Sequence, residues 1–317
     1  MIPTTRELLL QRAREGTSRG ARNDPWHLAI AIEGGGMRGV VAGGMVSALE
    51  EMEMLKCFDS IHGSSAGACA GAYFAAGQAR LGTSIYYENI NNSKFINFAR
   101  VFAGKPMMST SYLIDQVMHV EKPLDVSKLL LGDKFLYIVT TETKTARACV
   151  FDAFRDADYF FNVLRATVTM PIIAGHAVVI DDHPLVDGGI VQQIPLHSAI
   201  NVGATHVLVL LTRTRGELER PERMSKLSLD YLGFRLMYGS ALAARYARRN
   251  TEINAVLHQV MESESDQAIK IDTLVRPTSA TYVDRLSMDA PVLRAAALEA
   301  RDTVVSYLTQ QSPSLNA

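Results

Sequence analysis

The chain has 317 residues, 48% of them hydrophobic and 21% charged, which excludes a disordered or fibrous protein. Its 32 lysines and arginines balance 33 aspartates and glutamates. The net charge of −1 gives no overall attraction to nucleic acid, so no nucleic-acid partner is predicted. The three cysteines lack a C-x-x-C spacing, which disfavours structural zinc or a disulfide framework and favours a reducing, cytoplasmic compartment.

The sequence predicts neither a secretory signal nor a membrane-spanning helix. Residues 1–24 contain several arginines without an apolar stretch after them. No run of about 18 uninterrupted apolar residues occurs in the chain. Any contact with a membrane is therefore expected to be peripheral.

Helices and strands are expected to alternate in the first quarter of the chain. In chain order the pattern predicts a helix at 4–15, a strand at 27–32, a helix at 40–54, a strand at 58–62 and a helix from 66 to about 79. The two strands are short and nearly all apolar, as in a parallel sheet that is covered on both faces. The order strand, helix, strand, helix predicts an α/β fold with a parallel sheet.

The remaining elements continue this fold. They are a mainly helical insertion at 81–131, strands at 135–141 and 146–151, a helix at 158–167, a hairpin over 177–186, a helix at 196–202, a strand at 206–211, a long helix or helix pair at 225–264 and a helix at 289–310. We expect three regions: an N-terminal helix and link (1–24), a catalytic domain (25–212) and a mainly helical C-terminal extension (213–317) that packs on the same domain.

A glycine-rich loop follows the first strand. Consecutive glycines at Gly34, Gly35 and Gly36 leave backbone N–H groups free to bind a developing oxyanion. The glycines also fit a dinucleotide-binding fingerprint, which requires an acidic residue about 20 positions further on. Asp59 lies at that distance, but it precedes the core of the second strand, so this alternative is disfavoured.

Ser65 lies at the centre of a second glycine motif, directly after the second apolar stretch. Gly63 and Gly67 flank it at two-residue offsets, the pattern of a nucleophile elbow. Such an elbow is a sharp strand-to-helix turn, in which the following helix directs its N-terminal amides toward the serine. The alternative is a turn that only packs a helix close to a strand.

A third motif lies past the middle of the chain. Asp187 ends a predicted strand, and Gly188 and Gly189 follow it in a tight loop. A carboxylate within hydrogen-bond distance of a serine can act as its general base without an imidazole. Taken alone, an Asp-Gly turn is common and carries no function.

The three motifs in this order resemble the patatin-like phospholipase family over about residues 27–212. The family pattern is G-G-G-x-[RK]-G, then G-x-S-x-G, then D-G-[GA], and all three are intact here. Residues 165–171 resemble the family's A-S-x-A-x-P-x-x-F segment imperfectly. Thr167 replaces the usual serine, and Ile173 and Ala174 replace the aromatic part.

The resemblance implies a three-layer α/β/α fold and hydrolysis of lipid or lysolipid acyl esters. Ser65 would be the nucleophile, Asp187 the acid of a Ser-Asp dyad, and Gly34, Gly35, Gly36 and Arg38 the oxyanion loop. No metal or cofactor is predicted, and the oligomeric state is not predicted. Two alternatives stay open: a catalytically silent lipid-binding scaffold, and a Ser-His-Asp esterase using His197, His206 or His258.

Two further groups of side chains are interpreted from their pattern alone. Arg245, Arg248 and Arg249 are expected to form a solvated basic face of the 225–264 region, with contact to phospholipid headgroups or a partner as the alternative. Phe102, with Met107 and Met108, could form a lid that meets lipid chains or could simply fill the core.

Overall fold

The computed structural model of the chain describes residues 2–130, 134–218, 229–261 and 268–309. Within these residues, one sheet has the strand order β5-β6-β3-β2-β1-β7-β8, and β4 pairs with β3. The strands are β1 (Leu28–Ile32), β2 (Ser60–Ser64), β3 (Leu136–Glu142), β4 (Ala148–Phe151), β5 (Val178–Ile180), β6 (His183–Asp187), β7 (His206–Thr214) and β8 (Lys270–Arg276).

The sheet is parallel from β3 to β8. The pairs β3-β2, β2-β1, β1-β7 and β7-β8 are parallel, whereas β4, β5 and β6 join by antiparallel pairing. The predicted mainly parallel sheet is therefore confirmed. Because β1 and β2 run in the same direction, the loops that follow them meet at one edge of the sheet.

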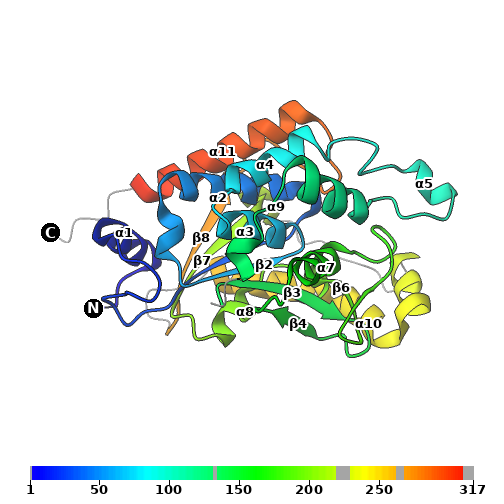
Figure 1. Cartoon of the computed structure of the whole chain (residues 1–317), viewed down its shortest axis with the longest axis horizontal. Helices are drawn as coiled ribbons and strands as arrows, with labels where there is room; N and C mark the ends of the chain where they lie inside the picture. The colour runs from blue at the N-terminus through cyan, green and yellow to red at the C-terminus, as the bar shows by residue number, and fades with distance from the viewer. Residues whose placement is uncertain (1, 131–133, 219–228, 262–267, 310–317) are drawn as a thin grey trace.

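Helices cover both faces of this sheet (Figure 1). They are α1 (Thr5–Glu15), α2 (Gly39–Glu51), α3 (Ala66–Ala75), α4 (Ala79–Glu88), α5 (Ala99–Phe102), α6 (Ser127–Leu130), α7 (Ala157–Val168), α8 (Leu196–Asn201), α9 (Arg215–Leu218), α10 (Leu229–Met261) and α11 (Ala290–Thr309), with a π-helical segment at Tyr112–Glu121. In Figure 1, α2, α4 and α11 lie on one side of the sheet, and α8 and α10 lie on the other.

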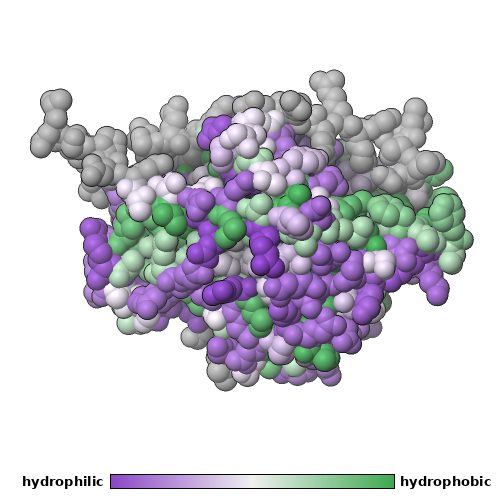
Figure 2. Space-filling view, turned by 90° about the horizontal axis from the view of Figure 1, so that it is seen from above, coloured by the Kyte–Doolittle hydropathy of each residue, from purple (hydrophilic) through white to green (hydrophobic). Residues whose placement is uncertain are grey.

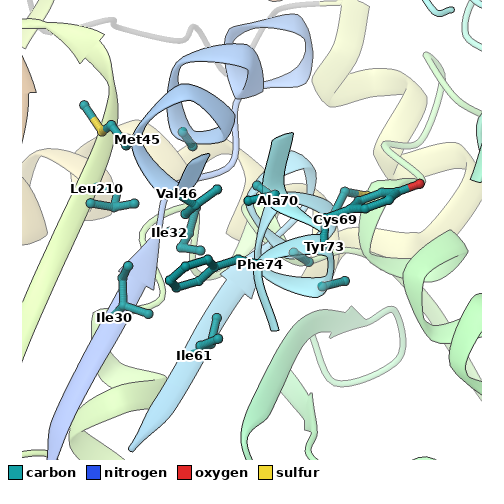
Figure 3. Packing of buried hydrophobic residues seen from close by; sticks show 14 of the residues in the cluster. Ile30, Ile32, Met45, Val46, Ile61, Cys69, Ala70, Tyr73, Phe74 and Leu210 are labelled. Atoms are coloured by element: carbon teal, nitrogen blue, oxygen red, sulfur yellow. The ribbon is translucent and has the colours of Figure 1, made fainter. Parts of the chain in front are cut away.

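The alternation of side chains along β1 explains the layers. Leu28, Ile30 and Ile32 join one buried cluster with α2, α3 and α11, whereas Ala29 and Ala31 join a second cluster with α8 and α10. Figure 3 shows the first of these clusters at close range. Both faces of β1 are fully buried, as its nearly all-apolar sequence predicts, and the three-layer architecture is confirmed.

The C-terminal extension is helical, as predicted, but it also adds a strand that the sequence analysis missed. β8 pairs with β7 at the edge of the sheet. α11 packs closely on α2, since a Cβ at Gly44 would lie 2.3 Å from the carbonyl oxygen of Ala297. The predicted long helix or helix pair over 225–264 is observed as α10, which is broken at Gly239, where φ is 88° and ψ is 178°. Its predicted ends at 225–228 and 262–264 lie outside the described residues.

Candidate active site

Ser65 lies at a sharp turn between β2 and α3. Its backbone has φ 53° and ψ −129°, a conformation that a non-glycine residue adopts only when its surroundings impose it. The flanking glycines permit the close approach that this turn needs. A Cβ at Gly67 would lie 2.3 Å from the carbonyl oxygen of Ile32, and one at Gly63 would lie 2.4 Å from Cα of Ala68.

The carboxylate of Asp187 accepts a hydrogen bond from this serine. The distance from Ser65 Oγ to Asp187 Oδ2 is 2.8 Å, although 122 positions separate the two residues in sequence. The second carboxylate oxygen, Oδ1, accepts the amide of Gly189 at 2.7 Å. The Asp187 backbone is held as well: its N–H donates to Thr169 O at 3.0 Å, and its carbonyl accepts Thr141 Oγ1 at 2.8 Å. The carboxylate is thus fixed in the orientation that meets the serine.

Burial raises the pKa of Asp187 to about 6. The hydrogen bonds from Gly189 and Ser65 oppose this rise, and so do the positive charges of Arg249 and Arg285. The Asp187 residue is only 3% exposed. A pKa close to the working pH suits a group that must both take and return a proton.

The glycine loop supplies backbone donors beside the serine, but not all three glycines are free. The Gly34 amide donates to Gln193 O at 2.9 Å. In the described part of the chain, the amides of Gly35 and Gly36 donate to no protein acceptor, and both residues line the same cavity as Ser65. Gly36 has φ 59°, and a Cβ there would lie 2.8 Å from the carbonyl oxygen of Arg285.

Arg38 is not brought to this cavity with the glycines. Its amide donates to Gly35 O at 3.2 Å, and its guanidinium lies 3.7 Å from the Glu217 carboxylate. The cavity beside Ser65 has no Arg38 atom in its wall. Of the four residues predicted for the oxyanion loop, the cavity wall therefore contains Gly34, Gly35 and Gly36 but not Arg38.

An apolar cavity of about 300 Å³ begins at Ser65 and Asp187. Its wall is made mainly by apolar and aromatic side chains of α3, α4 and the segment after α4. They include Cys69, Tyr73, Ile85, Tyr86, Phe95 and Met108. Tyr73 and Phe74 of α3, seen in Figure 3, extend from the same helix that begins at the serine turn.

Thr167 holds the serine turn in place, a role that the sequence analysis did not assign. Its Oγ1 accepts the amide of Ser65 at 2.9 Å and donates to Val139 O at 2.5 Å. The signal was present in the sequence, because Thr167 occupies the position where the family segment has serine. Both residues carry the hydroxyl that this contact needs.

A buried hydrogen-bond network connects Asp187 to the end of β1. Arg249 Nε donates to Gly189 O at 2.6 Å, and its Nη2 donates to Gln193 Oε1. Gln193 Nε2 in turn donates to Glu33 Oε1 at 2.8 Å. Since Gly189 also donates to Asp187, the network fixes the loop around the carboxylate.

The prediction of a solvated basic face is wrong for Arg249. This side chain is only 9% exposed and lines the cavity beside Asp187. Arg245 is half-buried and donates to Glu252 and to Val191 O, and only Arg248 is exposed. Burial lowers the pKa of Arg249 to about 10, so the guanidinium stays charged at neutral pH.

No histidine of the described residues lines the cavity that contains Ser65. His206 lies at the amino end of β7, where its Nε2 meets Pro3 O, and His197 lines a separate groove. His258 is on the exposed face of α10. The dinucleotide alternative also lacks support, because Asp59 lies at the amino end of β2 and forms ion pairs with arginines.

Nowhere in the described ranges do three or more His, Cys, Asp or Glu side chains gather as a metal site would require. None of the helices in those ranges is both long enough and apolar enough to cross a bilayer.

Comparison with known proteins gives one family and several distant relatives. The model of the family described as Patatin-like phospholipase matches residues 30–200. The uncharacterized protein YjjU of Escherichia coli (strain K12) is 24% identical in an alignment of 198 positions that covers 59% of this chain and 52% of YjjU. The chain thus spans about half the length of that relative.

Solved structures also match, VipD and ExoU among them. VipD from Legionella pneumophila has 12% identity and a TM-score of 0.45, with 91% of this chain and 67% of VipD covered. The type III effector protein ExoU has 16% identity and a TM-score of 0.41, with 92% of this chain and 53% of ExoU covered.

Proposed function

Because the chain belongs to the patatin-like phospholipase family, we propose that it is a serine lipid acyl hydrolase that works through a dyad of Ser65 and Asp187. The single observation that carries this proposal is the 2.8 Å hydrogen bond from Ser65 Oγ to Asp187 Oδ2. It lies at the wall of an apolar cavity, where an acyl chain can bind.

In the acylation step, Asp187 Oδ2 takes the Ser65 proton while Oγ attacks the carbonyl carbon of the ester. The carbonyl π bond becomes a lone pair, and the resulting oxyanion is bound by the amides of Gly35 and Gly36. When the intermediate collapses, the bond between carbon and the alcohol oxygen breaks. The alcohol leaves with the proton that Asp187 held, and the acyl group stays on Ser65.

In the deacylation step, a water molecule takes the place of the alcohol. Asp187 accepts one water proton as the oxygen attacks the acyl-serine, and the same amides bind the second oxyanion. Collapse breaks the bond from Oγ to the acyl carbon, and Oγ recovers its proton from Asp187. The products are a carboxylic acid and the free enzyme.

The cavity favours a lipid acyl ester as substrate. Its volume of about 300 Å³ lies at the lower end of the range for ligand pockets, roughly 300–1,000 Å³. Its apolar wall excludes water from the acyl chain, which strengthens the electrostatic contacts at the carbonyl. We place the enzyme in the cytoplasm, in peripheral contact with a membrane, and its three free cysteines are consistent with a reducing compartment.

The test is hydrolysis of p-nitrophenyl butyrate and of a lysophospholipid by purified variants. Ser65→Ala and Asp187→Asn should each lower kcat by about 10³-fold or more, because each removes a member of the dyad. Ser64→Ala is the matched control. Its hydroxyl is buried and has no hydrogen-bond partner among the described residues, so its removal should leave the rate within about twofold of the wild type.

The outcomes separate the alternatives. Full activity in Asp187→Asn would contradict the dyad and favour a histidine base. A wild-type protein that hydrolyses neither ester would contradict the enzyme assignment and favour a lipid-binding scaffold.

A further inference from the structure

An exposed arm projects from the wall of the acyl cavity. We define the arm as residues 97–107; it contains α5 and is closed at its base by a hydrogen bond from Asn97 N to Met107 O of 2.9 Å. The residues just outside it, Phe95 and Met108, both line the cavity. In Figure 1, α5 stands out from the body of the protein. The arm is thus continuous with the wall that holds the acyl chain.

The arm exposes large apolar side chains to solvent. Phe102 is 93% exposed, Val101 56% and Phe98 55%. Figure 2 shows hydrophobic surface at the end of the molecule where α5 lies in Figure 1. Three adjacent exposed apolar side chains on one projecting turn are unusual in a protein surface that meets only water.

Two segments beside the base of the arm also expose apolar side chains. Ile172 is 40% exposed, and Leu232 and Leu236 on the first part of α10 are 51% and 78% exposed. These segments lie against one another: a Cβ at Gly233 would be 2.6 Å from Ile172 Cδ1, and Met108 N donates to Ile173 O at 2.9 Å. We call the six side chains Phe98, Val101, Phe102, Ile172, Leu232 and Leu236 the apolar rim.

The charge of the arm and the residues beside it points to an anionic surface. Between Asn89 and Ile114 the sequence has three cations, Lys94, Arg100 and Lys105, and no aspartate or glutamate. Lys94 and Lys105 are exposed. Apolar side chains flanked by cations are the composition that binds at the boundary between headgroups and acyl chains in membranes that contain anionic lipid.

We propose that the apolar rim docks the protein on an anionic lipid bilayer, so that an acyl chain passes from the bilayer along Phe95 and Met108 into the cavity. This inference rests on the proposed lipid hydrolase function and names the surface through which that function reaches its substrate. The insertion of Phe98 and Phe102 supplies the apolar attraction, and Lys94 and Lys105 supply the selectivity for negative charge.

The experiment is flotation with vesicles of equal parts phosphatidylglycerol and phosphatidylcholine, compared with phosphatidylcholine alone. All proteins carry Ser65→Ala, so that no lipid is consumed. The parent should float with the anionic vesicles and less with the neutral ones. The additional pair Phe98→Ser and Phe102→Ser should lower partitioning by about tenfold or more. Lys105→Glu should weaken binding to anionic vesicles only.

Leu298→Ser is the matched control, because Leu298 is 55% exposed on α11, a helix that supplies no side chain to the rim. It should bind vesicles as the parent does. A parent that does not float with anionic vesicles would overturn the inference, as would a double variant that floats as well as the parent. Light scattering would also overturn the inference if it showed that the parent is a dimer and the double variant a monomer. A second copy of the chain would then cover the rim.

The catalytic proposal is judged separately. In proteins that keep Ser65, we compare the rate of vesicle-lipid hydrolysis with the rate of p-nitrophenyl butyrate hydrolysis. The ratio of the two rates should be about tenfold lower in the double variant than in the wild type. If the hydrolase proposal is wrong, the wild type will not hydrolyse p-nitrophenyl butyrate. That result would not affect the flotation of the Ser65→Ala proteins.

Discussion

The environment of Asp187 sets the pH dependence of the reaction. With its pKa raised to about 6 by burial, the carboxylate is mainly protonated below that pH and mainly ionised above it. Only the ionised form can take the Ser65 proton. The rate constant kcat/KM for a soluble ester should therefore rise through about pH 6 and level off by about pH 7.5. A profile that is flat between pH 5 and 7 would contradict this assignment.

The same burial makes Asp187 costly for the fold. Between about pH 4 and pH 6 the folded chain holds the Asp187 proton more tightly than the unfolded chain does, so the free energy of unfolding falls as pH rises. Asp187→Asn removes this cost and keeps an oxygen that accepts the Gly189 amide. It should raise the free energy of unfolding at pH 8 by up to about 3 kcal/mol and by almost nothing near pH 4. Urea denaturation at both pH values measures the difference, and an equal effect at both would count against it.

Arg249 lowers the pKa of Asp187 and holds the loop beside it. Arg249→Met removes the positive charge, which should raise the pKa of Asp187 and shift the pH profile of kcat/KM to higher pH. The rate at pH 6 should then fall about tenfold. Part of the loss should be recovered at pH 8.5. Arg248→Met on the exposed side of α10 is the control and should leave the profile in place. A uniform loss at every pH would indicate a purely structural role for Arg249.

At the scale of elements, the end of α7 is tied to the turn between β2 and α3 through Thr167. Thr167→Val keeps the shape but leaves the Ser65 amide without its acceptor, which should cost about 1–3 kcal/mol of stability and lower kcat. Thr167→Ser keeps the hydroxyl and should retain most of the stability and most of kcat. Thermal unfolding and ester hydrolysis of the two variants provide the check, and equal behaviour of valine and serine would contradict this role.

Several elements followed from local sequence because one local cause dominated each. β1 is buried on both faces and is therefore apolar throughout, and its glycine loop marks where it ends. β8 was missed because an edge strand buries only some of its residues, Ile271, Leu274 and Arg276 among them, and has no continuous apolar run. The break of α10 at Gly239 agrees with the helix-pair alternative for residues 225–264, because glycine adopts its φ of 88° without strain.

In the candidate site, too, local sequence could place some residues and could not place others. Ser65 and Asp187 stand in short motifs whose glycines are required by backbone contacts, so their positions could be named from the sequence. The burial of Arg249 could not, because in sequence it is one of several arginines on a helix. Its place beside Asp187 depends on how α10 crosses the sheet. The pairing of the Gly34 amide with Gln193 O likewise joins segments that are far apart in the chain.

For the whole molecule, we propose that residues 25–212 form the catalytic domain, that 1–24 are an N-terminal helix and link, and that 213–317 complete the same domain. β8 extends the central sheet, α11 covers α2, and α10 places Arg249 at the cavity. The C-terminal residues therefore complete the proposed site as well as cover the core. The apolar rim draws on both regions, since α5 precedes residue 212 and α10 follows it.

The most direct test of the whole account is mass spectrometry after reaction with a fluorophosphonate, a reagent that phosphonylates activated serines. The account predicts one adduct, on the peptide that contains Ser65, with much slower labelling in Asp187→Asn. An adduct on another serine, or labelling of Ser65 at the same rate without the carboxylate, would contradict it.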